Sequence, residues 1–269
     1  VEAYNEFIRK YPEGQQYIDI FNLKSLDNGM KFVGSHAFPS NNVQWARSFG
    51  EEDVVELSAC MAVDSNDFYV AGGTVVRSDT GTSDAWVIKL GKDGKMIWNK
   101  FIGDNYNDEL KILESNNKNE IIGIGHTWLG RDSSSRQSWI FKLGPDGQKL
   151  WSKKLGSFQA TCLLLPGQGH IFLGGYESDS CGIRHYAMIT LNEYGKRLWS
   201  RTYTGTGELV NLSLSPDKRI LVTGNHWRAK LGPRGYLIWE SPFAVTDSIL
   251  NSVSQARGEI LHLGLRNRS

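Results

Sequence analysis

The sequence predicts an all-β fold, a β-propeller of about six four-stranded blades, because three markers recur in a constant order. The first marker is a tryptophan in a short apolar segment: Trp45, Trp98, Trp151, Trp199 and Trp239. The second is a glycine that closes an apolar run: Gly34, Gly72, Gly125, Gly174, Gly224 and Gly264. A repeat of roughly 40–50 residues is typical of propellers and solenoids.

The third marker is a four-residue turn just before the tryptophan segment. It occupies residues 91–94, 144–147, 192–195 and 232–235, and each copy ends in glycine. One complete copy of the repeat predicts four strands, at Glu109–Glu114, Glu120–His126, Ser138–Leu143 and Lys149–Lys154. These segments are rich in Ile, Leu, Val, Trp and Phe, and Asn, Asp, Gly and Pro separate them. They are too short for helices, so each copy is interpreted as one blade.

The repeat divides the chain into six blades, of which the first and last are incomplete. Their ranges are 17–49, 54–101, 108–155, 160–203, 208–243 and 248–264. The fifth blade is short, with its third strand at Trp227–Leu231. The alternative is a five-bladed ring in which residues 1–50 and the C-terminal segment share a blade. An unprotected edge at the terminal blades could also accept a strand from a partner.

The second blade resembles a known repeat. The segment Ser83–Leu90, then Gly94, Ile97-Trp98, Gly103 and Asn107-Asp108-Glu109 is similar to the repeat of a large group of secreted bacterial and archaeal β-propeller proteins. It resembles WD40 and PQQ-type quinoprotein repeats more distantly. The resemblance covers roughly residues 20–266 and implies blade architecture. It implies no shared catalytic motif and no quinone cofactor, and it suggests an extracytoplasmic or secreted protein.

Residues 1–16 precede the propeller, which takes residues 17–269 as a single domain. Val1, Tyr4, Ile8 and Tyr11 share one face at helical spacing, and Pro12 and Gly14 end the pattern. The sequence therefore predicts a short N-terminal helix, which either packs on the propeller or serves as a linker.

Composition argues against several classes of partner. Hydrophobic residues make up 40% and charged residues 22%, and the net charge of +1 gives no broad electrostatic footprint for nucleic acid. No apolar run reaches the ~18 residues of a membrane span. The three cysteines have no spacing typical of a metal site. Cys60 and Cys162 fall in predicted first strands, and a bridge between Cys162 and Cys181 is left open.

In propellers of the WD40 type, the loops between blades and those after second strands share one face. If this chain shares that geometry, as the resemblance implies, polar and aromatic side chains gather on one loop face. Binding residues usually lie on such loops. The candidate ligand-binding residues there are His36, His126, Trp128, Asp132, Tyr176, His226 and Trp227. The segments His126-Thr127-Trp128 and Asn225-His226-Trp227 are interpreted as aromatic platforms for sugars or peptides.

No metal or cofactor is predicted. His36, His126 and His226 recur near the marker glycine and could supply zinc ligands. The simpler interpretation is that the histidine was copied with the repeat, because ligands from different blades would lie far apart. The acidic segment Asp104–Asp108 has oxygen ligands at alternating positions, as calcium loops do, but lacks the glycine and glutamate of an EF-hand. Capping of the turn by its side chains is the simpler interpretation.

The sequence favours a non-enzymatic binding or scaffolding module that presents its loop face to a protein, peptide or glycan. It contains no nucleophile elbow, phosphate loop or His-Glu-x-x-His motif. A subunit of a larger assembly is a variant of the same hypothesis. The alternative is a hydrolase or lyase that uses scattered residues in the central funnel, such as Glu52, Asp108 and His126, since fold does not dictate function.

Overall fold

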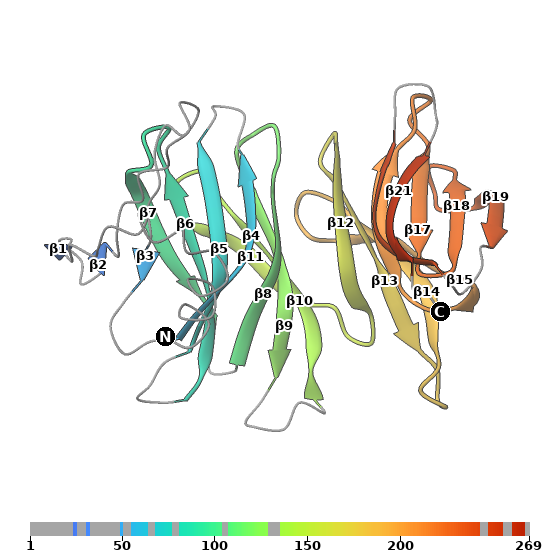
Figure 1. Cartoon of the computed structure of the whole chain (residues 1–269), viewed down its shortest axis with the longest axis horizontal. Coiled ribbons are helices and arrows are strands. Elements are labelled where there is room, and N and C mark those ends of the chain that lie inside the picture. The colour runs from blue at the N-terminus through green and yellow to red at the C-terminus, as the bar shows by residue number, and fades with distance from the viewer. Residues whose placement is uncertain are drawn as a thin grey trace.

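The computed structural model consists of antiparallel sheets and contains no helix in the part of the chain that it describes. It describes residues 68–76, 81–103, 107–128 and 135–242 in full, and the backbone of strands at 24–25, 31–32, 49–50, 55–63, 247–254 and 260–266. The predicted N-terminal helix lies outside these residues. Figure 1 shows the sheets following one another in chain order.

Four sheets have four strands each, and we call them blades two to five, following the repeats of the sequence. Blade two comprises β4 (Val55–Val63), β5 (Tyr69–Val76), β6 (Ser83–Leu90) and β7 (Met96–Ile102). Blade three comprises β8 (Asn107–Ser115), β9 (Ile121–Trp128), β10 (Gln137–Leu143) and β11 (Lys149–Lys154). Blade four comprises β12 (Gln159–Gly167), β13 (His170–Ser178), β14 (Arg184–Leu191) and β15 (Arg197–Thr206). Blade five comprises β16 (Leu209–Leu214), β17 (Ile220–Gly224), β18 (Trp227–Leu231) and β19 (Leu237–Pro242).

Two smaller sheets come from the ends of the chain. β1 (Lys24–Ser25), β2 (Lys31–Phe32) and β3 (Phe49–Gly50) form one, and β20 (Asp247–Ser254) pairs with β21 (Ile260–Arg266) in the other. The strands of the four central blades confirm the predicted segmentation, including the short third strand of blade five. The number of blades stays a prediction.

Each blade pairs its strands in sequence order, and the first strands of successive blades pack on one another. β4 contacts β8, β8 contacts β12, β12 contacts β16 and β16 contacts β20. The register shifts by one residue within each of these first strands, as between Leu110 and Ile112. Beside this bulge the backbone of Glu109 approaches Gly125 so closely that a Cβ atom at Gly125 would collide with the Glu109 carbonyl oxygen. Gly125, one of the marker glycines, is therefore required by close approach of two strands.

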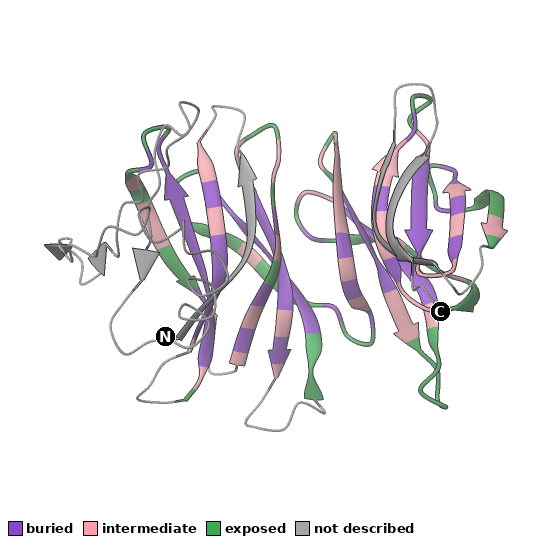
Figure 2. Cartoon of the chain, viewed as in Figure 1, coloured by how far each residue is buried: buried purple, intermediate pink, exposed green. Residues whose placement is uncertain are grey.

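The hydrophobic core lies between the blades. One cluster joins blades two and three, another joins blades three and four, and a third joins blades four and five. The second and third strands of the blades carry most of the buried residues, while the outer strands β11, β15 and β19 are largely exposed and β7 is partly exposed (Figure 2). Face-to-face packing of blades therefore buries both faces of each sheet, which explains the nearly continuous apolar pattern of the third strands.

The two cysteines with described side chains are free. Cys162 is buried in β12 and Cys181 is exposed, so they form no disulfide. Burial raises the pKa of the Cys162 thiol to about 12, which makes it an inert part of the core. Cys60 lies in β4, as its position in a predicted first strand requires.

Candidate functional site

The loop end of blade three carries a cluster of polar and aromatic side chains. Glu109 comes from β8, His126 and Trp128 from β9, and Arg136 immediately precedes β10. The Arg136 guanidinium contacts the Glu109 carboxylate, donates to Nδ1 of His126 over 3.0 Å, and lies 5.5 Å from the centre of the Trp128 ring. Alternation along the strands places these side chains on the face of blade three that turns toward blade four, beyond the buried Ile124.

The charge state of His126 follows from these contacts. Burial, together with the positive charge of Arg136, lowers the pKa of His126 to about 4, although Glu109 acts in the opposite sense. The imidazole is therefore neutral at pH 7, and its Nδ1 accepts the hydrogen bond from Arg136. The carboxylate of Glu109 is balanced by Arg136 and also by Lys111.

Blade four carries a related cluster at the same end. Arg184 begins β14, opposite the end of β13, as Arg136 precedes β10. Its guanidinium lies 4.4 Å from the centre of the Tyr176 ring, and its Nη1 is 3.0 Å from Oε2 of Glu208, which comes just before β16 of blade five. Each cluster thus combines an arginine, an aromatic or imidazole ring and a glutamate. We call the two clusters together the arginine rim: Glu109, His126, Trp128, Arg136, Tyr176, Arg184 and Glu208.

The connection between β13 and β14 extends this surface. Nε2 of His185 lies 3.1 Å from Oδ2 of Asp179, and Nδ1 lies 3.2 Å from the carbonyl oxygen of Gly205. The hydrogen bond with Asp179 raises the pKa of His185 and lowers that of Asp179. The pair is solvent-exposed and sets the shape of the connection, since Asp179 also accepts from the amides of Cys181 and Ile183.

The structure gathers three of the seven candidate residues in the arginine rim: His126, Trp128 and Tyr176. His226 lies in the two-residue connection between β17 and β18. Trp227 is only 5% exposed, stacks on Tyr186 at 5.1 Å and donates from Nε1 to Glu240, so its ring belongs to the core. His36 and Asp132 lie outside the described residues, as does most of the acidic segment 104–108.

Sequence reasoning missed four members of the rim: Glu109, Arg136, Arg184 and Glu208. A signal for the arginines was present, because Arg136 and Arg184 stand at the same distance before the leucines that end β10 and β14. Aligning the blades on those leucines would have revealed it. Within the described residues no cluster of His, Cys, Asp and Glu could hold a metal ion, and no helix is long and apolar enough to cross a membrane.

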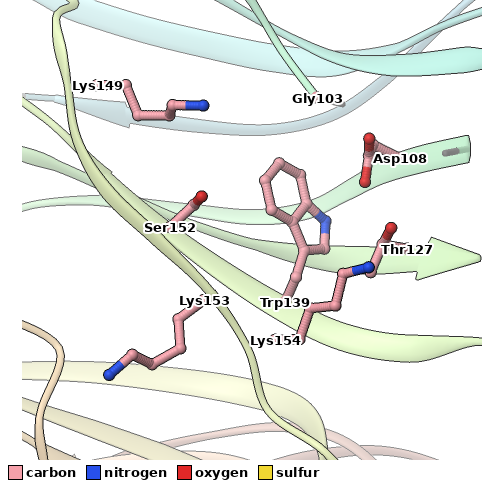
Figure 3. A pocket seen from close by; sticks show the side chains of 8 residues that line it. All are labelled: Gly103, Asp108, Thr127, Trp139, Lys149, Ser152, Lys153 and Lys154. Atoms are coloured by element: carbon pink, nitrogen blue, oxygen red, sulfur yellow. The ribbon is translucent and has the colours of Figure 1, made fainter. Parts of the chain in front are cut away.

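A separate cavity of about 220 Å³ lies on the other face of blade three, toward blade two (Figure 3). Its inner wall contains Asp108, Thr127 and Trp139, all at least nine-tenths buried. Its outer wall is formed by β11, which contributes lysines and a serine. The full lining is Gly103, Asp108, Thr127, Trp139, Lys149, Ser152, Lys153 and Lys154.

Comparison with solved structures agrees with this architecture. The chain is similar to the β-propeller domain of the Trilobed protease from Pyrococcus furiosus, with a TM-score of 0.52 and 11% identity, over 93% of this chain and 79% of that one. The chain resembles β-propellers in its fold. No protein-family model and no curated protein matches the sequence.

Two further propeller comparisons give lower scores. The WD40 domain of Pan2 from Neurospora crassa has a TM-score of 0.48 and 14% identity, over 70% of this chain and 50% of that one. Sqt1 from Chaetomium thermophilum has a TM-score of 0.45 and 12% identity, over 90% of this chain and 77% of that one. The chain thus spans half the length of the Pan2 domain. At these identities the comparisons show the fold alone.

Proposed function

We propose that this protein is a binding or scaffolding module whose loop face, centred on the arginine rim, holds a protein or peptide partner. The observation that carries the proposal is the repetition of the rim on successive blades. Arg136 and Arg184 occupy equivalent positions, and each lies over a ring and beside a glutamate. Arginine and aromatic residues are the side chains most enriched at the centres of protein interfaces.

The two arginines of the rim are held in position by their neighbours and remain exposed to solvent. The ion pairs fix the guanidinium groups in place, yet the side chain of Arg136 is 39% exposed and that of Arg184 is 55% exposed. An arginine already positioned by stacking and pairing loses less conformational freedom when a partner binds. Each guanidinium still has N–H groups to offer a backbone carbonyl or carboxylate of a partner. This geometry suits an extended peptide that crosses from blade three to blade four.

A hydrolase or lyase is the second candidate, and the His126–Glu109 contact is the observation that favours it. Nδ1 of His126 lies 3.8 Å from Oε2 of Glu109. However, a pKa of about 4 makes His126 a weak base at neutral pH, and a general base works best when its pKa is near the working pH. The binding function is therefore the better supported of the two.

The test is selection of random heptapeptides by display on phage against the immobilised full chain, with a glycan array in parallel. We expect enriched peptides whose binding falls at least tenfold in the Arg136→Ala and Arg184→Ala variants. Arg234→Ala is the matched control, because Arg234 is exposed on the turn at the opposite end of blade five. Binding should be unchanged in that variant.

Three outcomes would contradict the proposal. Enrichment could fail altogether, or selected peptides could bind the rim variants as well as the original chain. Ligands could also come from the glycan array alone. Turnover of ester or glycoside substrates that disappears in His126→Gln, with unchanged melting, would support the second candidate in its place.

A further inference from the structure

The cavity of blade three has an inner wall that lacks hydrogen-bond partners. Nε1 of Trp139 and Oγ1 of Thr127 are buried and have no partner in the described part of the chain. The two residues are 6% and 3% exposed. In Figure 3 the indole nitrogen of Trp139 faces the side of the cavity where Thr127 and Asp108 lie. A buried donor without an acceptor is costly, so unpaired donors beside a cavity indicate a missing oxygen atom.

Asp108 gives the same end of the cavity a hydrogen-bond acceptor. It is 2% exposed, and its carboxylate lies with that of Asp84 around Gly103, where a Cβ atom would be 2.9 Å from Oδ2 of Asp108. A carboxylate can accept several hydrogen bonds at once, so Asp108 can accept from a ligand in addition to its own contacts. An inner wall with two donors and a carboxylate matches a ligand with several hydroxyl groups, since each hydroxyl both donates and accepts.

The outer wall adds positive charge. Lys149, Lys153 and Lys154 line it together with Ser152, and all four are exposed residues of β11. Lys153 is occupied, because its Nζ donates to the carbonyl oxygen of Gly195 over 2.7 Å. The amino group of Lys149 has no hydrogen bond or ion pair within the described residues, and in Figure 3 it extends over the far end of the cavity. An anionic group at that end would gain a charge-assisted contact.

We propose that this cavity binds a small polyhydroxylated anion, a monosaccharide that carries one carboxylate or one phosphate. Trp139 and Thr127 donate to its ring or hydroxyl oxygens, Asp108 accepts from its hydroxyl groups, and Lys149 pairs with its anion. The volume of about 220 Å³ suits one sugar unit and is below the ~300–1,000 Å³ of sites for drug-sized ligands. This site lies on the opposite face of blade three from the arginine rim and is independent of the proposed peptide partner.

One lysine of the outer wall reaches toward the inner wall. In Figure 3 the Lys154 side chain extends from β11 toward Thr127, in front of the inner wall. Lys154 has a contact of its own and a long flexible chain, so its outward rotation would exchange that contact for solvent without a change in the backbone.

The experiment is a titration of the ¹⁵N-labelled full chain with glucuronate, glucose 6-phosphate, glucose and inorganic phosphate, each up to 20 mM. The readout is the indole N–H resonance of Trp139, assigned by its loss in Trp139→Phe. We expect glucuronate or glucose 6-phosphate to shift this resonance with a Kd on the order of 1 mM. The two sugars distinguish a carboxylate ligand from a phosphate ligand, and glucose should bind at least fivefold more weakly than the better of them.

Two pairs of variants test the assignment of residues. Thr127→Val should weaken binding about threefold to tenfold by removing one donor. Its control is Thr190→Val, because Thr190 is also a buried hydroxyl without a partner in the described residues but lies outside the cavity. Lys149→Gln should weaken binding of the anionic sugar to the level of glucose. Its control is Arg197→Gln, at the equivalent position of β15.

The proposal is overturned if neither anionic sugar shifts the Trp139 resonance, or if glucose binds as well as they do. It is also overturned if inorganic phosphate binds as tightly as glucose 6-phosphate, since that would indicate surface lysines alone. If Thr127→Val and Thr190→Val changed sugar binding equally, the inner wall would take no part in binding and the proposal would fail. Because the valine variants each delete a costly unpaired hydroxyl, both should remain folded.

Discussion

Trp98 donates a hydrogen bond of 3.0 Å from its indole Nε1 to the carbonyl oxygen of Pro145, although the two residues belong to successive blades. Trp151 makes the same contact with Glu193, also at 3.0 Å. Trp199 packs against Gly235 in the next turn along. The tryptophan marker and the turn marker of the sequence are thus two halves of one contact between neighbouring blades.

Replacing Trp151 should destabilise the fold, whereas replacing Trp239, the last tryptophan of the series, should not. We expect Trp151→Phe to lower the free energy of unfolding by about 1–2 kcal/mol, because it removes the donor to Glu193 and some packed area. Trp239 is 39% exposed and its indole N–H makes no hydrogen bond in the described residues, so Trp239→Phe should change stability by less than about 0.5 kcal/mol. Urea unfolding measures both, and equal losses would contradict the role assigned to the contact.

Gly235, which ends the turn between β18 and β19, is held by two constraints. Gly235 has φ of 73°, and a Cβ atom there would lie 2.5 Å from Cζ3 of Trp199. Gly156 has φ of 69° but nothing within 4 Å of such an atom. We expect Gly156→Ala to cost about 1 kcal/mol from the left-handed backbone alone, and Gly235→Ala about 2–4 kcal/mol. Thermal and urea unfolding measure both losses of stability. Equal losses for Gly156→Ala and Gly235→Ala would show that the contact with Trp199 imposes no constraint.

His126 should make stability depend on pH. Its folded pKa of about 4 is below its usual 6.5, so between these values the unfolded chain binds more protons than the folded one. Its contribution to stability is therefore fully present above pH 6.5 and is lost as pH falls toward 4. The loss is on the order of 3 kcal/mol. We expect His126→Gln to flatten the pH profile of the unfolding free energy in this window, and an unchanged slope would contradict the shift.

Lys142 of blade three should contribute more to stability than Lys230, its counterpart in blade five. Its Nζ lies 2.6 Å from Oε2 of Glu120 and 3.2 Å from the carbonyl oxygen of Glu193, and its side chain is 4% exposed. We expect Lys142→Met to cost about 2–4 kcal/mol, because Glu120 loses its buried cationic partner and keeps only the hydrogen bond from Asn116. Adding Glu120→Gln should restore part of the loss, and a double variant no more stable than the single one would contradict this account.

Lys230 is the matched control for that prediction. Its Nζ lies 2.8 Å from Oδ2 of Asp217, but the two side chains are 23% and 55% exposed. An exposed pair contributes little, so Lys230→Met should cost less than about 1 kcal/mol.

The segmentation of the chain was predictable because local chemistry sets it. A four-residue turn that ends in glycine specifies a hairpin, and the alternation of side chains specifies the strand on either side. This is why the fourth strand of blade three, Lys149–Lys154, and the third strand of blade five, Trp227–Leu231, occur with the predicted bounds. The candidate site was predictable only in part. His126 and Trp128 lie in the blade-three cluster of the rim and Tyr176 in the blade-four cluster, whereas Trp227 is buried against Tyr186.

By itself the sequence determined the repeat, the strands of the central blades and the turn glycines, since these depend on residues close together in the chain. The tertiary structure decided which side chains meet between blades. Arg184 reaches Glu208 and Trp98 reaches Pro145 because one blade packs face to face on the next. The same packing leaves Thr127 and Trp139 beside a cavity. The physical reason is that alternation fixes which face of a sheet a residue occupies, whereas its contacts on that face depend on the register and spacing of the neighbouring blade.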